Sequence, residues 1–289
     1  MNTNSSRPVV DFHFHSTASD GTMTPAEVYC RACDRGADMV ALTDHDTVAG
    51  CQQLAELLRS GKIENRAALI SGIEFSCVWG KRSIHIVGLG FDPNHAAIVD
   101  GVKHQTRVRA ERAEAIGRQL EKLGFPGCYE GAIEIAGQSQ IGRPHFAQYM
   151  LDKGFVTSIK QAFDKYLGSG KVGDVKSGWP ALEEVVRWIV AAGGIAVVAH
   201  PERYKLTRTK LSQLLDVFTA AGGRGIEMAG RSQHINARRT IEELCAKYKL
   251  FASVGSDFHN PEYRWNDLTV VPSVGEGLCP VWRQLTPMV

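Results

Sequence analysis

The sequence predicts an α/β fold that is built largely from parallel strands. Short apolar runs alternate with stretches in which apolar residues recur at helical spacing, and this alternation is typical of parallel α/β folds. Of the 289 residues, 44% are hydrophobic and 22% are charged. That is the composition of an ordinary globular protein, so a disordered chain, a collagen and a coiled coil are excluded.

The expected strands are seven short apolar runs. In chain order they are Val9–Phe14, Asp38–Thr43, Ala68–Ile73, Ile84–Leu89, Gly194–Ala199, Gly225–Met228 and Leu250–Val254. Helices are expected between them. Thr24, Pro25 and Glu27 provide the start signal of one helix, as N-cap, first-turn proline and capping-box glutamate, and the leucine spacing over 211–218 predicts another.

Between about Val102 and Trp179 the alternation stops, because this stretch carries helix signals and almost no strand signal. Apolar positions over 113–123 trace one helix face that ends at Gly124, and residues 155–167 are expected to form a further helix. A stretch of about 80 residues is too long for a plain loop. We therefore expect a discontinuous main domain over 8–101 and 180–289, with a helical insertion over 102–179.

The charges are nearly balanced, with 33 Lys and Arg against 31 Asp and Glu. This balance argues against a protein that coats nucleic acid through a large basic excess. The first residues lack the apolar segment of a secretory signal, and no apolar run approaches the roughly 18 residues of a membrane span. We therefore expect a cytoplasmic protein without membrane contact, and no obligate protein partner is evident.

Cys30 and Cys33 form a C-x-x-C pair, which is one signal of zinc or redox chemistry. Both fall inside the helix that Thr24 is expected to begin, where they would be neighbours three residues apart. No second pair completes a zinc site. We therefore expect them to pack as small hydrophobic side chains.

Metal-binding residue types stand at the ends of the expected strands. His13 and His15 alternate along an extended segment, so they face the same side. The carboxyl ends of the strands in a parallel α/β barrel meet on one face, and burying so many ionisable groups without a cation would be costly. The sequence therefore predicts a metal centre. The acidic and histidine side chains at these positions include His13, His15, Asp20, Asp44, His45, Asp46, Glu74, His85, His200, Glu227, Asp257 and His259.

This donor set indicates the kind of metal. Imidazoles and carboxylates without a thiolate suit Mn, Fe or Zn. The candidates are too many for one ion, so two or three cations could share a bridging carboxylate. Multinuclear centres of this kind activate water and stabilise the oxygens of a phosphoester during hydrolysis.

Four segments resemble the motifs of the PHP (polymerase and histidinol phosphatase) phosphoesterases, in family order and over nearly the whole chain. They are Asp11–His15, Thr43–Asp46, Ala199–Pro201 and Gly255–His259. The resemblance implies a distorted (β/α)7 barrel with a trinuclear metal centre, in which manganese is expected first and iron or zinc are alternatives.

Carried onto the matching positions, the resemblance implies three ligand sets. The first metal would be held by His13, His15, Glu74 and Asp257, the second by Glu74, His85 and His200, and the third by Asp20, His45 and His259. Glu74 would bridge the first two metals. The residues expected to be catalytic are His13, His15, Glu74, Asp257 and His259.

Three further segments resemble the branch of the family that acts on nucleotides, and they are Ile141–Ala147, Gly170–Lys171 and Ala199–Tyr204. This branch hydrolyses 3′,5′-nucleoside bisphosphates and short 5′-phosphorylated RNA. Asp20, where some relatives have His, is also similar to it. The resemblance implies that Arg143, Lys171 and Arg203 bind the substrate phosphates, for which Arg offers a planar fork and Lys a compact charge. His145 either contacts substrate or only begins a helix.

Two positions depart from that branch. Asp174 stands where relatives often have Tyr, which places an acid close to the expected phosphate pocket. Gln233 and His234 stand where relatives often have His one position earlier. Either departure could alter the substrate preference. The arginines at positions 107, 109, 112 and 118 are expected to form a solvated helix face.

The predicted function is hydrolysis of the 3′-phosphoester of a 5′-phosphorylated nucleotide by a metal-dependent phosphoesterase. A 3′,5′-bisphosphate would give a nucleoside 5′-monophosphate. Two alternatives remain open. A histidinol-phosphate phosphatase is disfavoured by the segments around Arg143 and Arg203, and a non-catalytic metal-binding or nucleotide-binding module is disfavoured by the full ligand set.

Overall fold

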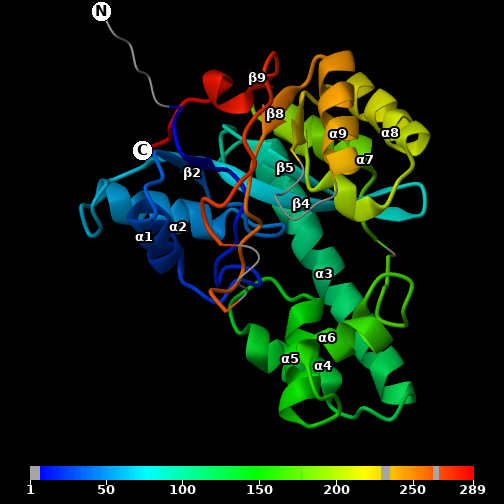
Figure 1. The fold of residues 1–289 in the computed structure, drawn as a ribbon. Helices are drawn as coiled ribbons and strands as arrows, with labels where there is room; N and C mark the ends of the chain where they lie inside the picture. The colour runs from blue at the N-terminus through cyan, green and yellow to red at the C-terminus, as the bar shows by residue number, and fades with distance from the viewer. Residues whose placement is uncertain (1–6, 177, 229–234, 263–266) are drawn as a thin grey trace, which may run out of the picture.

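The computed structural model describes residues 7–176, 178–228, 235–262 and 267–289, which form the α/β chain shown in Figure 1. Its strands are β1 (Val10–Asp11), β2 (Met39–Ala41), β3 (Ala68–Ile70), β4 (Gly72–Trp79), β5 (Arg82–Leu89), β6 (Ile195–Val198), β7 (Gly225–Glu227), β8 (Phe251–Ser253) and β9 (Cys279–Pro280). Its α-helices are α1 (Pro25–Asp34), α2 (Ala49–Arg59), α3 (Ala96–Lys122), α4 (Cys128–Ala136), α5 (Arg143–Asp152), α6 (Ile159–Ala162), α7 (Leu182–Ala191), α8 (Arg208–Ala220) and α9 (Ile235–Lys247). Short helical turns of other types cover Phe163–Leu167, Pro201–Tyr204 and Val281–Gln284.

The strands form two sheets. β1, β2 and β3 pair in parallel, and the second sheet has the order β4-β5-β6-β7-β8-β9. Within the second sheet, β4–β5 and β5–β6 are antiparallel, whereas the later pairs are parallel. Single parallel bridges, Phe14 with Phe258 and His45 with Glu74, connect the two sheets. The described chain thus contains mixed sheets instead of the closed barrel of parallel strands that the sequence predicts.

The region around β4 differs most from the expected strands. The apolar run over 68–73 divides into β3 and β4, and β4 continues to Trp79 and turns back into β5 through Gly80 and Lys81. Gly80 has a φ of 59°, which suits glycine in a two-residue hairpin turn. Glu74 therefore lies within a strand and not at a strand end as expected, and His85 lies within a strand, as the apolar run over 84–89 predicts. Their side chains share one face of the hairpin, because Glu74 pairs with Val87 and His85 with Ser76, each two positions from the other residue.

Helix α1 confirms its predicted start. The Thr24 side chain accepts a hydrogen bond from the Glu27 backbone and the Glu27 carboxylate accepts one from the Thr24 backbone, with Pro25 in the first turn. Cys30 and Cys33 are free thiols that pack against the core between this helix and β1–β3. The structural interpretation of the C-x-x-C pair is therefore confirmed.

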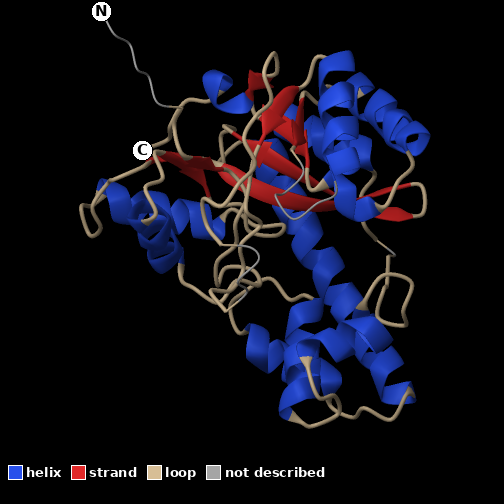
Figure 2. Cartoon of the chain, in the orientation of Figure 1, coloured by secondary structure: helices blue, strands red, loops and turns tan. Residues whose placement is uncertain are grey.

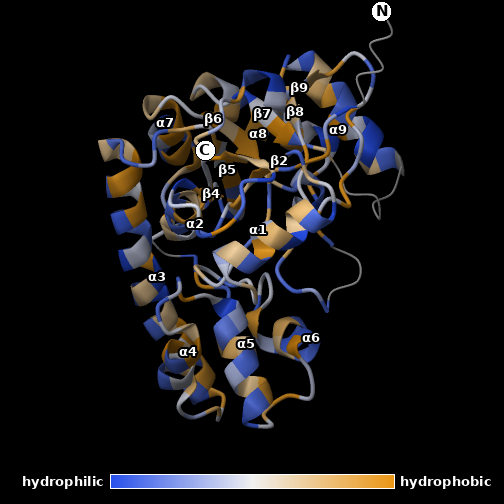
Figure 3. Ribbon diagram, turned by 90° about the vertical axis from the view of Figure 1, so that its left-hand side faces the viewer, coloured by the Kyte–Doolittle hydropathy of each residue, from blue (hydrophilic) through white to orange (hydrophobic). Residues whose placement is uncertain are grey.

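Helix α3 links the two parts of the molecule, as Figures 1 and 2 show. It begins at Ala96, so one continuous helix runs through the boundary expected at residue 102. Gly101 allows its first half to lie against Trp188 of α7, because a Cβ there would come within 2.7 Å of the indole. Its second half contributes Ile116 and Leu120 to an apolar core with α4 and α5. The apolar faces of these helices turn toward one another in Figure 3.

In the described part of the chain, no helix has both the length and the apolar character that crossing a membrane requires.

Candidate metal centre

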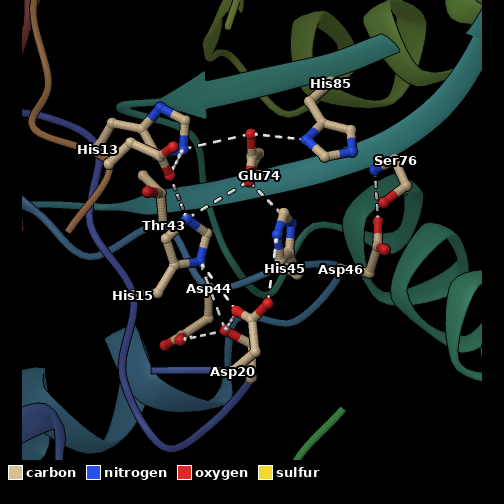
Figure 4. Close-up of polar contacts among 12 residues, drawn as sticks. His13, His15, Asp20, Thr43, Asp44, His45, Asp46, Glu74, Ser76 and His85 are labelled. Atoms are coloured by element: carbon tan, nitrogen blue, oxygen red, sulfur yellow. Dashed lines mark hydrogen bonds and ion pairs between the residues drawn. The ribbon is translucent and has the colours of Figure 1, made fainter. Parts of the chain in front are cut away.

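Glu74 lies at the middle of a cluster of histidines. Its side chain is fully buried, and Figure 4 shows it among the imidazoles of His13, His15, His45 and His85. The closest distances from its Oε1 are 3.2 Å to His13 Nε2, 3.0 Å to His85 Nδ1 and 3.0 Å to His200 Nε2, and those from its Oε2 are 3.4 Å to His15 Nε2 and 2.8 Å to His45 Nδ1. One carboxylate therefore approaches five imidazoles.

Asp20 and Asp257 continue the cluster on the side of His15. Asp20 lies 3.4 Å from His259 Nε2 and 3.8 Å from His45 Nε2. Asp257 Oδ1 lies 3.3 Å from His15 Nε2 and 3.5 Å from His13 Nε2. The nine candidate ligands named from the sequence are thus brought together in one place.

Three groups within this cluster have donor atoms close enough to hold a cation. They are His13 with His15 and Glu74, His45 with Glu74 and His85, and His15 with Asp20, His45 and His259. These groups overlap the three ligand sets that the resemblance implies, with four differences. His45 stands with Glu74 and His85 as well as with Asp20, and His15 also stands with Asp20. Asp257 and His200, which the resemblance places in the first and second sets, are in none of the three groups.

The carboxylates of the cluster are held in their charged form. Burial alone would raise the pKa of Glu74, but His45, His13 and His85 bring it well below its usual value. The pKa of Asp257 is likewise lowered against the effect of burial, by Arg203 and His13. Ionised carboxylates in a buried site are ready ligands for a divalent cation.

Some of the histidines carry protons that balance the negative charge of these carboxylates. Burial opposes protonation of His259, yet Asp20 and Asp257 raise its pKa to about 9. Carboxylates also raise the pKa of His13 and of His45 against the effect of burial. By contrast, burial lowers the pKa of His15 to about 3, so this imidazole is neutral. Cations bound here would replace the protons and remove the same excess of negative charge.

Several polar atoms at the centre face one another in ion pairs but lack a well-formed hydrogen bond. His13 Nε2, His15 Nε2, His45 Nδ1 and Glu74 Oε2 are buried, and none forms a hydrogen bond of good geometry with any described residue. Buried polar atoms without such hydrogen bonds are costly unless they bind something. Together with the mixed imidazole and carboxylate donors, they fit a metal centre.

Glu227 supports the cluster, although the family resemblance does not include it among the implied ligands. It lies in β7, its Oε1 is 2.7 Å from His13 Nδ1, and its Oε2 accepts a hydrogen bond of 2.6 Å from the His200 backbone. Carboxylates in this position orient a ligating imidazole and fix its tautomer. Like several of the ligands, Glu227 lies at the end of a strand, and this position is the sequence signal that points to a role in the site.

A cavity of about 400 Å³ opens onto the metal centre. Glu74, His85 and His200 line one side of it, and residues of the helical segment line the other. Arg143 and Arg203 both line this cavity, as expected for phosphate-binding residues. Arg203 forms an ion pair with Asp257, which couples it directly to the cluster.

The other two expected substrate residues lie elsewhere. Lys171 is exposed and is not among the residues that line the cavity. His145 lines a neighbouring cavity of about 700 Å³, which it shares with Asp257 and His259. His145 Nδ1 also accepts a hydrogen bond of 3.0 Å from the Gly142 backbone, so His145 helps to begin α5.

The prediction that four arginines of α3 face solvent is wrong for two of them. Arg107 and Arg118 are exposed, but the exposed fractions of Arg109 and Arg112 are only 9% and 8%. Gln105, Arg109 and Arg112 follow at spacings of four and three residues, which places them on one helix face. That face turns toward the cavity, and both arginines line it.

The first departure from the nucleotide-acting branch is also at the cavity. Asp174 Oδ1 lies 3.6 Å from Arg143 Nη1, and its Oδ2 lies 3.0 Å from Lys176 Nζ. The acid therefore partly neutralises the expected phosphate site. Gln233 and His234, the second departure, lie outside the described residues.

The fold and the site together define an α/β protein with a cluster able to bind metal and a cavity beside it that four arginines help to line. Comparison with known proteins places it more narrowly: the chain belongs to the PHP domain family, which matches residues 11–222. The resemblance predicted from the sequence is therefore confirmed.

Individual relatives cover nearly the whole chain. It is 40% identical to a 3′,5′-nucleoside bisphosphate phosphatase of Chromobacterium violaceum, over 96% of each protein. It is also 40% identical to a 5′-3′ exoribonuclease of Haemophilus influenzae, over 95% of this chain and 98% of that protein. Among solved structures, an amidohydrolase from Chromobacterium violaceum with bound sulfate superimposes with a TM-score of 0.85 at 40% identity, over 95% of both chains.

Proposed function

We propose that this protein hydrolyses the 3′-phosphoester of a nucleotide that also carries a 5′-phosphate. The observation that carries this proposal is that residues of the histidine and carboxylate cluster and several arginines line the same cavity. A substrate with two phosphates suits such a cavity, because one phosphate can meet the metal centre while the other meets arginine. The relatives named as a bisphosphate phosphatase and an exoribonuclease support the same reaction.

The cluster would hold two or three divalent cations, with manganese preferred to iron or zinc. The proposed ligands are His13, His15, Asp20, His45, Glu74, His85, His200, Asp257 and His259. The chemistry that such cations supply is activation of water and neutralisation of charge on the phosphate oxygens. Glu74 would bridge two of them, since its two oxygens face different histidines.

Arg143 and Arg203 would bind substrate phosphate through charge-assisted hydrogen bonds. A phosphate held at a fixed place in the cavity sets the position of the 3′-phosphoester relative to the ligand cluster. A 3′,5′-bisphosphate and a short 5′-phosphorylated RNA present the same 5′-terminal nucleotide. One geometry would therefore serve both substrates.

The arrangement of the two domains and the cellular location of the protein are part of the same proposal. Residues 8–101 and 180–289 would act as one distorted barrel around the ligand cluster, with 102–179 as a cap over the cavity. The bridges that connect the two sheets support this arrangement, since one of them joins His45 to Glu74. The cytoplasmic location stays a prediction.

A panel of substrates tests the reaction through the release of phosphate or of mononucleotides. It contains a 3′,5′-nucleoside bisphosphate, a 5′-phosphorylated RNA trinucleotide and histidinol phosphate, each with Mn²⁺ and with a chelator. We expect hydrolysis of the first two with Mn²⁺ alone. A preference for histidinol phosphate would replace the nucleotide assignment, and no turnover of any substrate would favour the binding module.

The roles of Arg143 and Arg203 can be tested by replacing each with alanine. We expect a loss of about 1.5–3 kcal/mol in transition-state stabilisation on the bisphosphate, the range for charge-assisted hydrogen bonds. The same replacements should matter little for a nucleoside 3′-monophosphate, which lacks the 5′-phosphate. The measurement is kcat/KM on both substrates, with Arg118→Ala on an exposed face of α3 as the matched control. Equal losses on both substrates would assign these arginines to structure or to the phosphate at the metal centre.

A further inference from the structure

Arg112 is a buried guanidinium that forms no ion pair within 4 Å with a carboxylate of the described residues, although Asp174 and Asp46 are near enough to favour its charged form. Only 8% of the residue is exposed, and its Nη1 is buried without a hydrogen-bond partner among the described residues. Its Cζ lies 4.2 Å from the ring centroid of Trp179, so the guanidinium rests on the indole. Burying a charge without hydrogen bonds or an ion pair is costly, and such a charge is retained where it binds something.

The neighbouring arginines differ from Arg112 because each has an acid beside it. Arg109 Nη2 lies 2.6 Å from Asp46 Oδ2, and Arg109 Nε donates to the same oxygen. Arg143 faces Asp174 across 3.6 Å. Arg112 therefore supplies the excess positive charge among these three arginines, all of which line the cavity.

The surroundings of Arg112 disfavour its charged form. Burial, and then the positive charges of Arg109 and Arg143, lower the pKa of Arg112 to about 9. An anion that entered the cavity at this point would offset the repulsion among the three guanidinium groups. The site is thus arranged to accept negative charge.

We propose that Arg112 binds a phosphate of the substrate jointly with Arg143, while Trp179 holds the guanidinium plane in place. This inference rests on the proposed function, which supplies a substrate with two phosphates. The phosphate bound here is the one away from the metal centre, which is the 5′-phosphate of a 3′,5′-bisphosphate or of a 5′-phosphorylated RNA. Arg112 takes the place in this pocket that the sequence assigned to Lys171.

The test replaces Arg112 by methionine, which keeps an apolar side chain on Trp179 and removes the charge. We expect KM for the 3′,5′-bisphosphate to rise about tenfold or more, as for the loss of a charged hydrogen bond. KM for a nucleoside 3′-monophosphate should stay the same. The Tm of the variant should equal or exceed that of the native protein, because a buried unpaired charge no longer opposes folding.

Arg107→Met is the matched control, since Arg107 is an exposed arginine of the same helix. An unchanged KM for the bisphosphate in Arg112→Met would overturn the inference. A lower Tm with equal losses on both substrates would also overturn it, because Arg112 would then have a structural role.

A binding measurement separates this inference from the proposed reaction. Calorimetric titration with adenosine 5′-monophosphate needs no turnover, and we expect Arg112→Met to weaken this binding about tenfold or more. Binding unaffected by Arg112→Met would refute the subsite. Failure of the native protein to hydrolyse the bisphosphate would instead refute the reaction.

Discussion

Replacing Glu74 by glutamine is expected to lower turnover of the 3′,5′-bisphosphate by about 10³-fold or more, the scale of losing a key electrostatic group. Glu74 is buried, and its two oxygens approach five imidazoles. Glutamine has nearly the same shape but no charge, and its NH₂ group would face positions where the carboxylate now accepts. Both proposed metal positions that share Glu74 should be disturbed together.

The experiment measures kcat and the metal content of the same preparations. Glu64→Gln is a suitable control, because Glu64 is an exposed glutamate that is not one of the ligand candidates. A Glu74→Gln protein with near-normal rate and near-normal metal content would show that Glu74 has only a structural role. Loss of rate without loss of metal would place the effect on the charge itself.

Removal of metal is expected to abolish hydrolysis and to lower the Tm. A ligand that binds only the folded state stabilises it by about 2.7 kcal/mol when its concentration is a hundred times its Kd. Elemental analysis of protein purified without added metal should find at least two transition ions per chain. Fewer than one ion per chain, combined with hydrolysis that resists the chelator, would contradict a multinuclear centre.

Return of the metal should also release protons. Neighbouring carboxylates raise the pKa of His13 well above its usual value and that of His259 to about 9, so at neutral pH these two imidazoles hold protons that a cation would displace. Titrating metal-free protein with Mn²⁺ in buffers of different ionisation enthalpy measures this release. Restoration of activity by Mn²⁺, Fe²⁺ or Zn²⁺ in separate samples then identifies the most effective metal.

The sequence predicted the ligand cluster because the side chains lie next to recognisable strands. His13 and His15 follow β1 at alternate positions, and Asp257 and His259 follow β8 in the same way. Such patterns are local, so they can be read without knowing how the strands pair. The helix start at Thr24 was predicted for the same reason, since a capping box lies within four consecutive residues.

The parts that could not be predicted depend on contacts between distant residues. Periodicity places Arg109 and Arg112 on a face of α3, but it does not say what covers that face. Asp46, which pairs with Arg109, is 63 residues away in the sequence, and Trp179 comes from the far end of the helical segment. The β4–β5 hairpin was missed because Ser76 and His85 interrupt its apolar pattern on the side that faces the site.

Helix α3 also determines how far Arg112 lies from the strand that carries Glu74. Gln105 Nε2 donates to Asp46 Oδ1 and to the Ser76 carbonyl, so this point of the helix is fixed to the strand that carries Glu74. Arg112 lies seven residues further on, or about 10 Å along the axis at about 1.5 Å per residue. One inserted residue between them would rotate Arg112 by about 100° and move it out of the cavity. In the proposed complex, the register of α3 would therefore determine the distance between the phosphate at Arg112 and the phosphate at the ligand cluster.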